Sequence, residues 1–343
     1  MRVVARGAVV ALVVGFVVVG SGVPAGAHQE WFVSDPEAYP LDLGALLRPG
    51  VVLAVAATVA VTVLLRPVAA RLPAPELAVI KPARRLASFV PWVPRLLAAH
   101  LGVSLLVLAF DRAVLDPGIH VPDGAGGTLL LVPQAVVGGL LIAGVLVRAA
   151  SVAIMLTGPL LVALQGPEAL VTLAVFVGIA AFLFMLPPRL KDGGRTDLDP
   201  PTLRRAALGL KLGAGVTLIS LAVVEKFANP AMARAMLEQE PLLNLLAPFG
   251  VSADAFAVVA GSVELLFGLL VISGALPQVV ALLAAVPFTA TLALFGATEL
   301  LGHLPFYGVL LAFLVLGSRE ETSRALSGLR RRPRARIRSE ALA

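Results

Sequence analysis

Glu264 is the residue in this chain whose type and position most clearly suggest chemistry. It lies in the middle of an otherwise apolar run at residues 255–274. A carboxylate at bilayer depth costs about 2.5–3.5 kcal/mol on insertion scales, so it usually faces a partner, a cavity or a ligand. Glu264 is therefore a candidate functional residue. The structural alternative is a protonated carboxyl that is hydrogen-bonded to a neighbouring helix.

Further polar residues are expected at the outer rim of the same site. Glu225 and Lys226 end one apolar run, and Asn229 follows them. Such a lining could relay protons, bind a polar head group or hold a quinone ring by hydrogen bonds. Glu225 and Lys226 could equally form an interfacial charge pair, because side chains at helix ends reach the membrane surface. Glu264 is expected to lie deeper than Lys226 and not to pair with it.

Three candidates come from the last two apolar runs. Glu299 and His303 are four residues apart, so they share a face if the helix at 277–298 continues through them. Tyr307 is expected to begin the following helix, at 304–317. All three could contribute to ligand binding or proton relay at the outer rim.

A metal site is a weaker hypothesis. His28, His120 and His303 are all expected on the outer face, and neutral imidazole suits copper and zinc. However, the sequence has no closely spaced ligand pattern such as His-Glu-x-x-His. Cysteine is absent, so no thiolate ligand, disulfide or c-type haem attachment can form within the chain. Any cofactor would be held non-covalently, and a quinone is the candidate.

The elements that position these residues are predicted to be transmembrane helices. Of the 343 residues, 59% are hydrophobic and 14% are charged, and the mean hydropathy is +0.95. Soluble domains are much less apolar, so the fold class is all-α, a polytopic transmembrane bundle in contact with the lipid bilayer. The net charge of +6 comes from basic loops and a basic tail, which fix membrane orientation and do not indicate nucleic-acid binding. Nine apolar runs are long enough to span, at about 49–65, 96–115, 128–147, 149–166, 169–187, 206–224, 255–274, 277–298 and 304–317.

The N-terminal segment 1–27 is typical of a signal peptide. Two arginines precede an apolar stretch, and Ala25-Gly26-Ala27 is a small-residue cleavage motif. An uncleaved first helix is the alternative. The basic segments 66–95, 189–205 and 319–343 are predicted to be cytoplasmic by the positive-inside rule, in the cell membrane, with 116–126 and 228–253 outside. The segment 228–253 is expected to form an interfacial or re-entrant helix pair.

An internal repeat relates the two halves of the chain. Gln134, Gly138 and Gly144 match Glu264, Gly268 and Gly274 at an offset of 130 residues. We therefore expect two four-helix units, at 95–188 and 204–318, preceded by a segment 28–94 that contains one extra span. Because each unit has an even number of spans, the units should be parallel repeats.

The stretch 204–317 resembles the DoxX family of bacterial membrane proteins. The carrying features are VEKFANP (224–230), the Glu264-x3-Gly268 helix, and FGATELLGHLPFYG (295–308). The resemblance implies a four-helix membrane module, named from a subunit of a thiosulfate:quinone oxidoreductase and found in membrane redox complexes. The upstream unit is a degenerate copy, since Gln134 replaces the carboxylate and the outer histidine is missing.

Three functional hypotheses follow. The first is a quinone- or lipid-binding subunit of a redox complex with membrane or periplasmic partner proteins and without catalytic activity on its own. The second is a transporter or lipid-handling protein, suggested by parallel repeats with a carboxylate at mid-membrane. The third is a scaffold whose Arg-rich tail binds anionic lipid.

Overall fold

The protein is all-helical throughout the part of the chain that its structure, a computed structural model, describes. The described residues are 33, 38–72, 74–77, 85–116, 119–121, 123–165, 169–295 and 297–328; of residues 165, 170, 294, 295 and 297–302 only the backbone is described. No strand occurs among them, in agreement with the predicted fold class. The predicted signal peptide and most of the basic tail lie outside these residues.

Each of the nine predicted apolar runs forms a helix. Six helices in the described part of the chain are long and apolar enough to cross a membrane, and three further apolar helices are shorter. The chain is therefore a multi-pass membrane protein. The nine helices are α2 (Pro49–Arg71), α4 (Val93–Phe110), α5 (Ala125–Ala143), α6 (Val147–Gln165), α7 (Leu170–Met185), α8 (Pro200–Leu221), α10 (Ala253–Ser273), α11 (Pro277–Phe295) and α12 (Ala297–Leu316).

The two predicted units share the close packing of their first two helices. In the first unit a Cβ added to Gly102 on α4 would lie 2.7 Å from the carbonyl oxygen of Gly138 on α5. In the second unit a Cβ added to Gly215 on α8 would lie 2.9 Å from the carbonyl oxygen of Gly268 on α10. Only glycine permits such backbone contact, the usual way in which membrane helices approach closely. The matching residues are 113 positions apart in the first helix (102 and 215) and 130 apart in the second (138 and 268).

The second helix of each unit also ends in the same way. Gly144 and Gly274 end α5 and α10 in the left-handed conformation, with φ of 73° and 68°. Two residues later, Leu146 and Leu276 both have positive φ, at 49° and 50°. Glycine is favoured at such a helix end because it has no Cβ, whereas a leucine with positive φ is uncommon. The same uncommon backbone therefore occurs at corresponding places.

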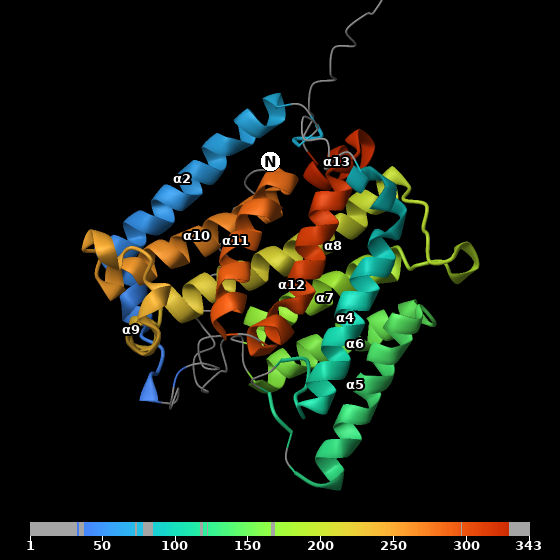
Figure 1. Ribbon diagram of the computed structural model, residues 1–343, viewed down its shortest axis with the longest axis horizontal. Coiled ribbons are helices and arrows are strands. Elements are labelled where there is room, and N and C mark those ends of the chain that lie inside the picture. Colours follow the sequence, from blue (N-terminus) through green and yellow to red (C-terminus); the bar gives the residue numbers. More distant parts are fainter. Residues whose placement is uncertain are drawn as a thin grey trace, which may run out of the picture.

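The units contact one another reciprocally. The fourth helix of the first unit, α7, packs on α8 through Gly178 and Gly213. The fourth helix of the second unit, α12, packs on α4 through Gly308 and His100. In Figure 1, α12 accordingly lies between α11 and the α4 side of the bundle. Exchange of equivalent contacts in this way is expected for parallel repeats related by an approximate two-fold axis.

Additional segments extend the two units. Helix α2 packs along α10 at the edge of the molecule (Figure 1). The short helix α13 (Glu320–Ser327) packs on α8, where Lys211 Nζ donates a 2.9 Å hydrogen bond to the carbonyl oxygen of Leu326. Lys211 is buried in this contact.

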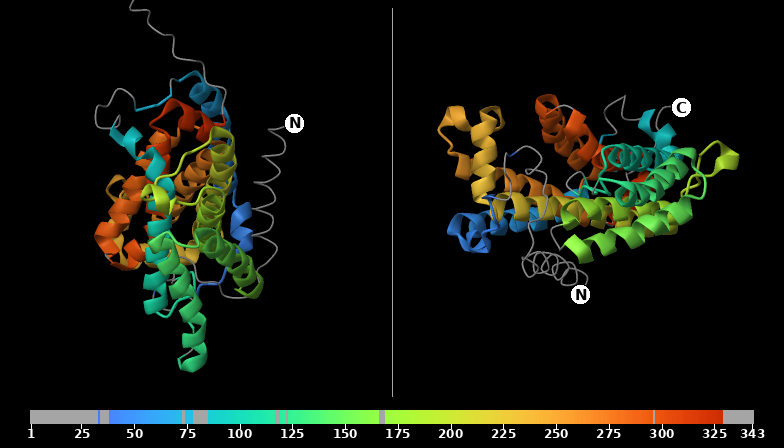
Figure 2. Two further views of the ribbon diagram at one scale, coloured as in Figure 1. Left: turned by 90° about the vertical axis from the view of Figure 1, so that its right-hand side faces the viewer. Right: turned by 90° about the horizontal axis from the view of Figure 1, so that it is seen from below.

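The segment between α8 and α10 differs from the expected helix pair. It forms one helix, α9 (Pro230–Gln239), followed by two single turns, η8 (Pro241–Leu243) and η9 (Ala247–Phe249). Prolines at 241 and 248 and the left-handed Gly250 limit regular helix after α9. Figure 2 shows α9 projecting from one end of the molecule. The described residues between α4 and α5 contain no corresponding helix, and this insertion accounts for the change of offset between the units.

The boundary between the last two spans was predicted at the wrong place. Helix α12 begins at Ala297, so Glu299, His303 and Tyr307 all lie on α12. Glu299 and His303 were expected at the end of the preceding helix, and Tyr307 at the start of the next. The polar residues and Pro305 weaken the apolar pattern there, but a proline is tolerated inside membrane helices because other groups satisfy the freed backbone.

Candidate functional site

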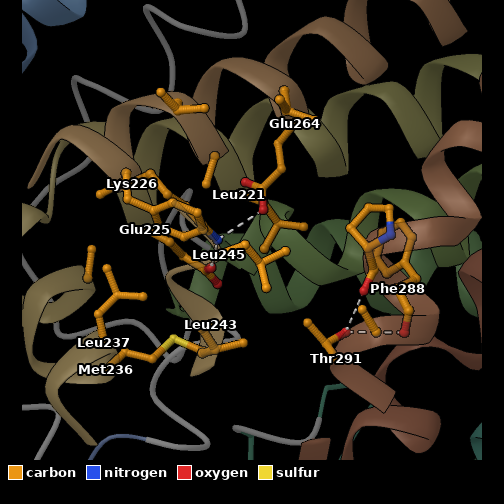
Figure 3. Close-up of a pocket in the computed structure, with 18 of the residues that line it drawn as sticks. Leu221, Glu225, Lys226, Met236, Leu237, Leu243, Leu245, Glu264, Phe288 and Thr291 are labelled. Atoms are coloured by element: carbon orange, nitrogen blue, oxygen red, sulfur yellow. Dashed lines mark hydrogen bonds and ion pairs between the residues drawn. The ribbon is translucent and has the colours of Figure 1, made fainter. Parts of the chain in front are cut away.

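A cavity of about 370 Å³ lies within the second unit, between α8, α9, α10, α11 and α12. Its polar lining consists of Glu225, Lys226, Glu264, Thr291 and His303, and its remaining lining is apolar (Figure 3). Ligand sites commonly combine such an apolar wall with a few convergent polar groups. The cavity is therefore the candidate binding site.

A π-helical turn places Glu225 and Lys226 in this lining. The turn η7 (Ala222–Phe227) continues α8, and Ala228 N donates a 2.7 Å hydrogen bond to Val223 O, five residues back. π-Helical turns are rare and occur frequently at functional sites. The extra residue per turn changes the rotation of the helix end, so two adjacent side chains both contribute to one cavity.

Glu225, Lys226 and Glu264 form a compact ion cluster. Lys226 Nζ lies 2.5 Å from Glu225 Oε2 and 3.1 Å from Glu264 Oε1, so the ammonium bridges the two carboxylates (Figure 3). The exposed fractions of the three side chains are 1% for Glu225, 12% for Lys226 and 28% for Glu264. Ion pairs shielded in this way are weakly screened and electrostatically strong.

The prediction that Glu264 does not pair with Lys226 is therefore wrong. It treated Lys226 as part of the rim, but the long lysine side chain reaches Glu264 across the helix interface. Gly261, one turn before Glu264, permits this approach. A Cβ on Gly261 would lie 2.7 Å from Phe227 Cε1 and 2.9 Å from Lys226 Cβ, so a larger residue would push α10 away from η7.

The second oxygen of Glu264 differs from the first. Oε2 is shielded from solvent and accepts no hydrogen bond from any residue that the structure describes. A buried polar atom without a partner is costly in free energy. A donor that reached this atom would satisfy it.

His303 contributes from the opposite side of the cavity. It is buried on α12, and its ring lies 4.6 Å from the ring of Phe288, centroid to centroid, in an edge arrangement. Either ring nitrogen of a histidine can donate or accept, depending on the tautomer. Thr291, by contrast, donates to backbone carbonyl oxygens of its own helix.

The other predicted rim residues have structural contacts. Asn229 caps α9 by accepting from Met232 N at 3.1 Å, and its amide donates to Tyr39 O at 2.8 Å. Tyr307 donates to Phe288 O at 2.8 Å from behind the cavity wall. Neither residue is among those that line the cavity. The side chain of Glu299 lies outside the described residues.

The metal hypothesis gains no geometric support. His120 lies in the turn after α4, in an antiparallel bridge with Ala113, whereas His303 lies in the cavity. Across the described ranges, no group of three His, Cys, Asp or Glu residues could hold a metal ion. Because His28 falls outside these ranges, a site that includes it stays a prediction.

Several lining residues were not predicted as site residues. Aromatic walls come from the membrane helices, and a set of aliphatic side chains comes from α9 and the turn that follows it. The apolar character of 228–253 was visible in the sequence, but not the cavity that it covers. The lining residues that were not predicted are Phe256, Phe267 and Phe288, with Met236, Leu237, Leu242, Leu243 and Leu245.

The corresponding place in the first unit is satisfied internally. Gln134 Nε2 donates to Ala113 O at 2.9 Å and to Leu105 O at 3.2 Å, while its Oε1 accepts from Leu115 N at 3.0 Å. At the offset of 113, Ala113 corresponds to Lys226. The side chain of Gln134 thus hydrogen-bonds to backbone groups at the end of the neighbouring helix. At the corresponding place in the second unit, Glu264 pairs with the side chain of Lys226.

Comparison with known protein families, with characterised proteins and with solved structures finds no match.

Proposed function

We propose that the protein is a DoxX-like membrane subunit that binds a quinone- or lipid-like molecule in this cavity and supports a redox complex. The observation that carries the proposal is the cluster of buried Glu225 with partly buried Lys226 and Glu264 at the wall of an otherwise apolar cavity. An amphipathic ligand matches this distribution of polarity, with its head group at the cluster and its tail against the apolar wall.

The apolar lining supplies the affinity for the tail. The cavity volume of about 370 Å³ lies within the usual range for small-molecule sites. Burying apolar area contributes about 25 cal/mol per Å², and Phe267 and Phe288 contribute aromatic side chains to the cavity wall. A head group with the first part of a long tail is a suitable size, and the remainder would extend into the bilayer.

The polar residues supply orientation and proton exchange. Lys226 can donate to a ring oxygen, the carboxylates can accept, and His303 can do either. A quinone bound here would exchange protons with these groups when a partner protein exchanges electrons with it. The chain contains no cysteine and therefore no thiolate-held or covalently attached haem centre. The proposal assigns the redox centre to a partner protein, either in the membrane or in the periplasm.

The proposal includes a location. The protein would reside in the cell membrane with its basic C-terminal segment in the cytoplasm, as the positive-inside rule requires. The cavity would then lie toward the outer side, beneath α9.

Mass spectrometry of the full chain purified in native lipid nanodiscs tests the proposal. We expect a quinone or another amphipathic molecule to co-purify with the wild-type protein and to be lost in Ala260→Phe, which places a phenyl ring in the cavity and narrows it. Val136→Phe, on the exposed face of α5, is the control and should retain the molecule. Retention by Ala260→Phe would contradict the assignment of the cavity. Proton-coupled uptake of a solute into vesicles would instead favour a transporter.

A further inference from the structure

One oxygen of the ion cluster is a hydrogen-bond acceptor that lacks a donor. The ammonium of Lys226 is already directed at one oxygen of Glu225 and at one oxygen of Glu264. Glu264 Oε2 is buried beside the same cavity and has no donor among the described residues. The unsatisfied group at this wall of the cavity is therefore an acceptor, Glu264 Oε2.

We propose that the cavity selects a ligand whose head group donates a hydrogen bond to Glu264, and so prefers a quinol to the corresponding quinone. This inference rests on the proposed function and adds which form of the ligand binds. A quinol carries phenolic O–H groups, whereas the ring oxygens of a quinone only accept.

The energetics favour the donor for two reasons. An O–H group directed at Oε2 would form a charge-assisted hydrogen bond, the stronger class, and it would satisfy an atom that is otherwise buried without a partner. A quinone carbonyl at the same place would bring its electronegative oxygen toward Glu264 Oε2, an oxygen that can only accept while the carboxyl is ionised. Its best donor, Lys226, is already held between Glu225 and Glu264.

The remaining polar lining does not reverse this preference. Thr291 donates its hydroxyl proton to backbone oxygens of α11. His303 lies against Phe288 and can serve a quinol or a quinone, according to its tautomer. Discrimination between the two forms is therefore assigned to Glu264.

The direct test compares the two redox forms of one ligand. The full chain in nanodiscs is titrated anaerobically with decyl-benzoquinol and with decyl-benzoquinone, and binding is followed by native mass spectrometry. We expect the quinol to bind at least about tenfold more tightly, which corresponds to about 1.4 kcal/mol. In Glu264→Gln the preference should fall below about threefold, because the neutral amide is a weaker acceptor. Ser262→Ala, on the same helix but outside the lining, should keep the wild-type ratio.

A third titration with a long-chain alkylamine separates this inference from the proposed function. Equal binding of quinol and quinone, or tighter binding of the quinone, would overturn the inference and leave quinone binding intact. Binding of the amine but of neither quinone form would support donor selection and reject a quinone site. Binding of none of the three ligands would overturn both. The wild-type ratio alone decides the inference if Glu264→Gln does not fold.

Discussion

Lys226 Nζ lies 3.1 Å from Glu264 Oε1, although Lys226 is at the end of one helix and Glu264 is in the middle of the helix packed against it. The contact depends on the π-helical turn that carries Lys226 and on Gly261, which lets the two backbones approach. It joins α8 and α10 by a charge pair at the cavity wall, so stability and ligand binding depend on the same residues.

Removal of the lysine should destabilise the protein strongly. Lys226→Met would leave two carboxylates facing each other in a shielded site. Breaking a buried ion pair from one side costs about 3–5 kcal/mol, and the partial exposure of Glu264 places this case at about 3 kcal/mol. Thermal unfolding in detergent measures the loss.

The triple variant Glu225→Gln, Lys226→Met, Glu264→Gln is the matched comparison. It removes the charges together, so it should recover most of the stability that Lys226→Met loses. It should nevertheless bind ligand poorly. An unfolding temperature no higher than that of Lys226→Met would show that the three residues do not act as one cluster.

The glycine contacts should be equally important for packing in both units. Gly268→Ala would place a methyl group 2.9 Å from Gly215 O, and Gly138→Ala would place one 2.8 Å from Gly102 O. Overpacking of this kind costs about 1–3 kcal/mol. We expect both variants to unfold earlier, but only Gly268→Ala to weaken ligand binding.

Gly139→Ala is the control for this pair. A Cβ on Gly139 meets nothing within 4 Å, so alanine there should be neutral or stabilising, given its higher helix propensity. Gly138 and Gly139 are adjacent, so they differ only in the face that they present. Equal stability of the two alanine variants would contradict the close contact between α4 and α5.

Membrane orientation can be tested without removing any native thiol, because the chain has no cysteine. Lys191→Cys and Gln239→Cys place single thiols at exposed positions in the loop before α8 and at the end of α9. We expect an impermeant maleimide to label Gln239→Cys in intact cells, and Lys191→Cys only after permeabilisation. Labelling of Lys191→Cys from outside would reverse the orientation.

The repeat shows how much of the fold the sequence could predict and why. Glycine spacing indicated equivalent helices because close helix packing restricts those positions to glycine, and the structure has the equivalent contacts of Gly138 and Gly268. Charge distribution and hydropathy identified the spans for similar reasons. The start of α12 was misplaced because hydropathy measures apolarity and not backbone continuity, so a helix that carries His303 and Pro305 seemed to be interrupted.

The candidate site was predicted in part. Glu225, Lys226, Glu264 and His303 do meet at one cavity, since buried polar residues in membrane helices tend to converge. The bridging role of Lys226 could not be predicted, because it depends on a π-helical turn with no sequence signal that we could use. Asn229 and Tyr307 were predicted from their polarity, but Asn229 donates to Tyr39 O and Tyr307 to Phe288 O, and neither lines the cavity.

The turn after α9 should form the mouth of the cavity within the membrane. Leu242 and Leu245 line the cavity, yet they are 71% and 72% exposed. Apolar residues that face both a cavity and the surroundings are stable in contact with lipid, and a lipophilic ligand could then enter from the bilayer without crossing water. A bimane label on Leu245→Cys in nanodiscs should be quenched by lipids that carry a shallow doxyl group.

Two controls make this last prediction specific. A bimane label on Gln239→Cys, at the exposed end of α9, should be quenched far less by the same lipids and more by aqueous iodide. Addition of decyl-benzoquinol should change the emission of the label at position 245 in the wild-type background but not in Ala260→Phe, whose cavity is narrowed by the phenyl ring. Stronger quenching of the label at position 245 by iodide than by doxyl lipid would place the mouth in water, and the ligand would then have to be delivered by a soluble carrier and not by the bilayer.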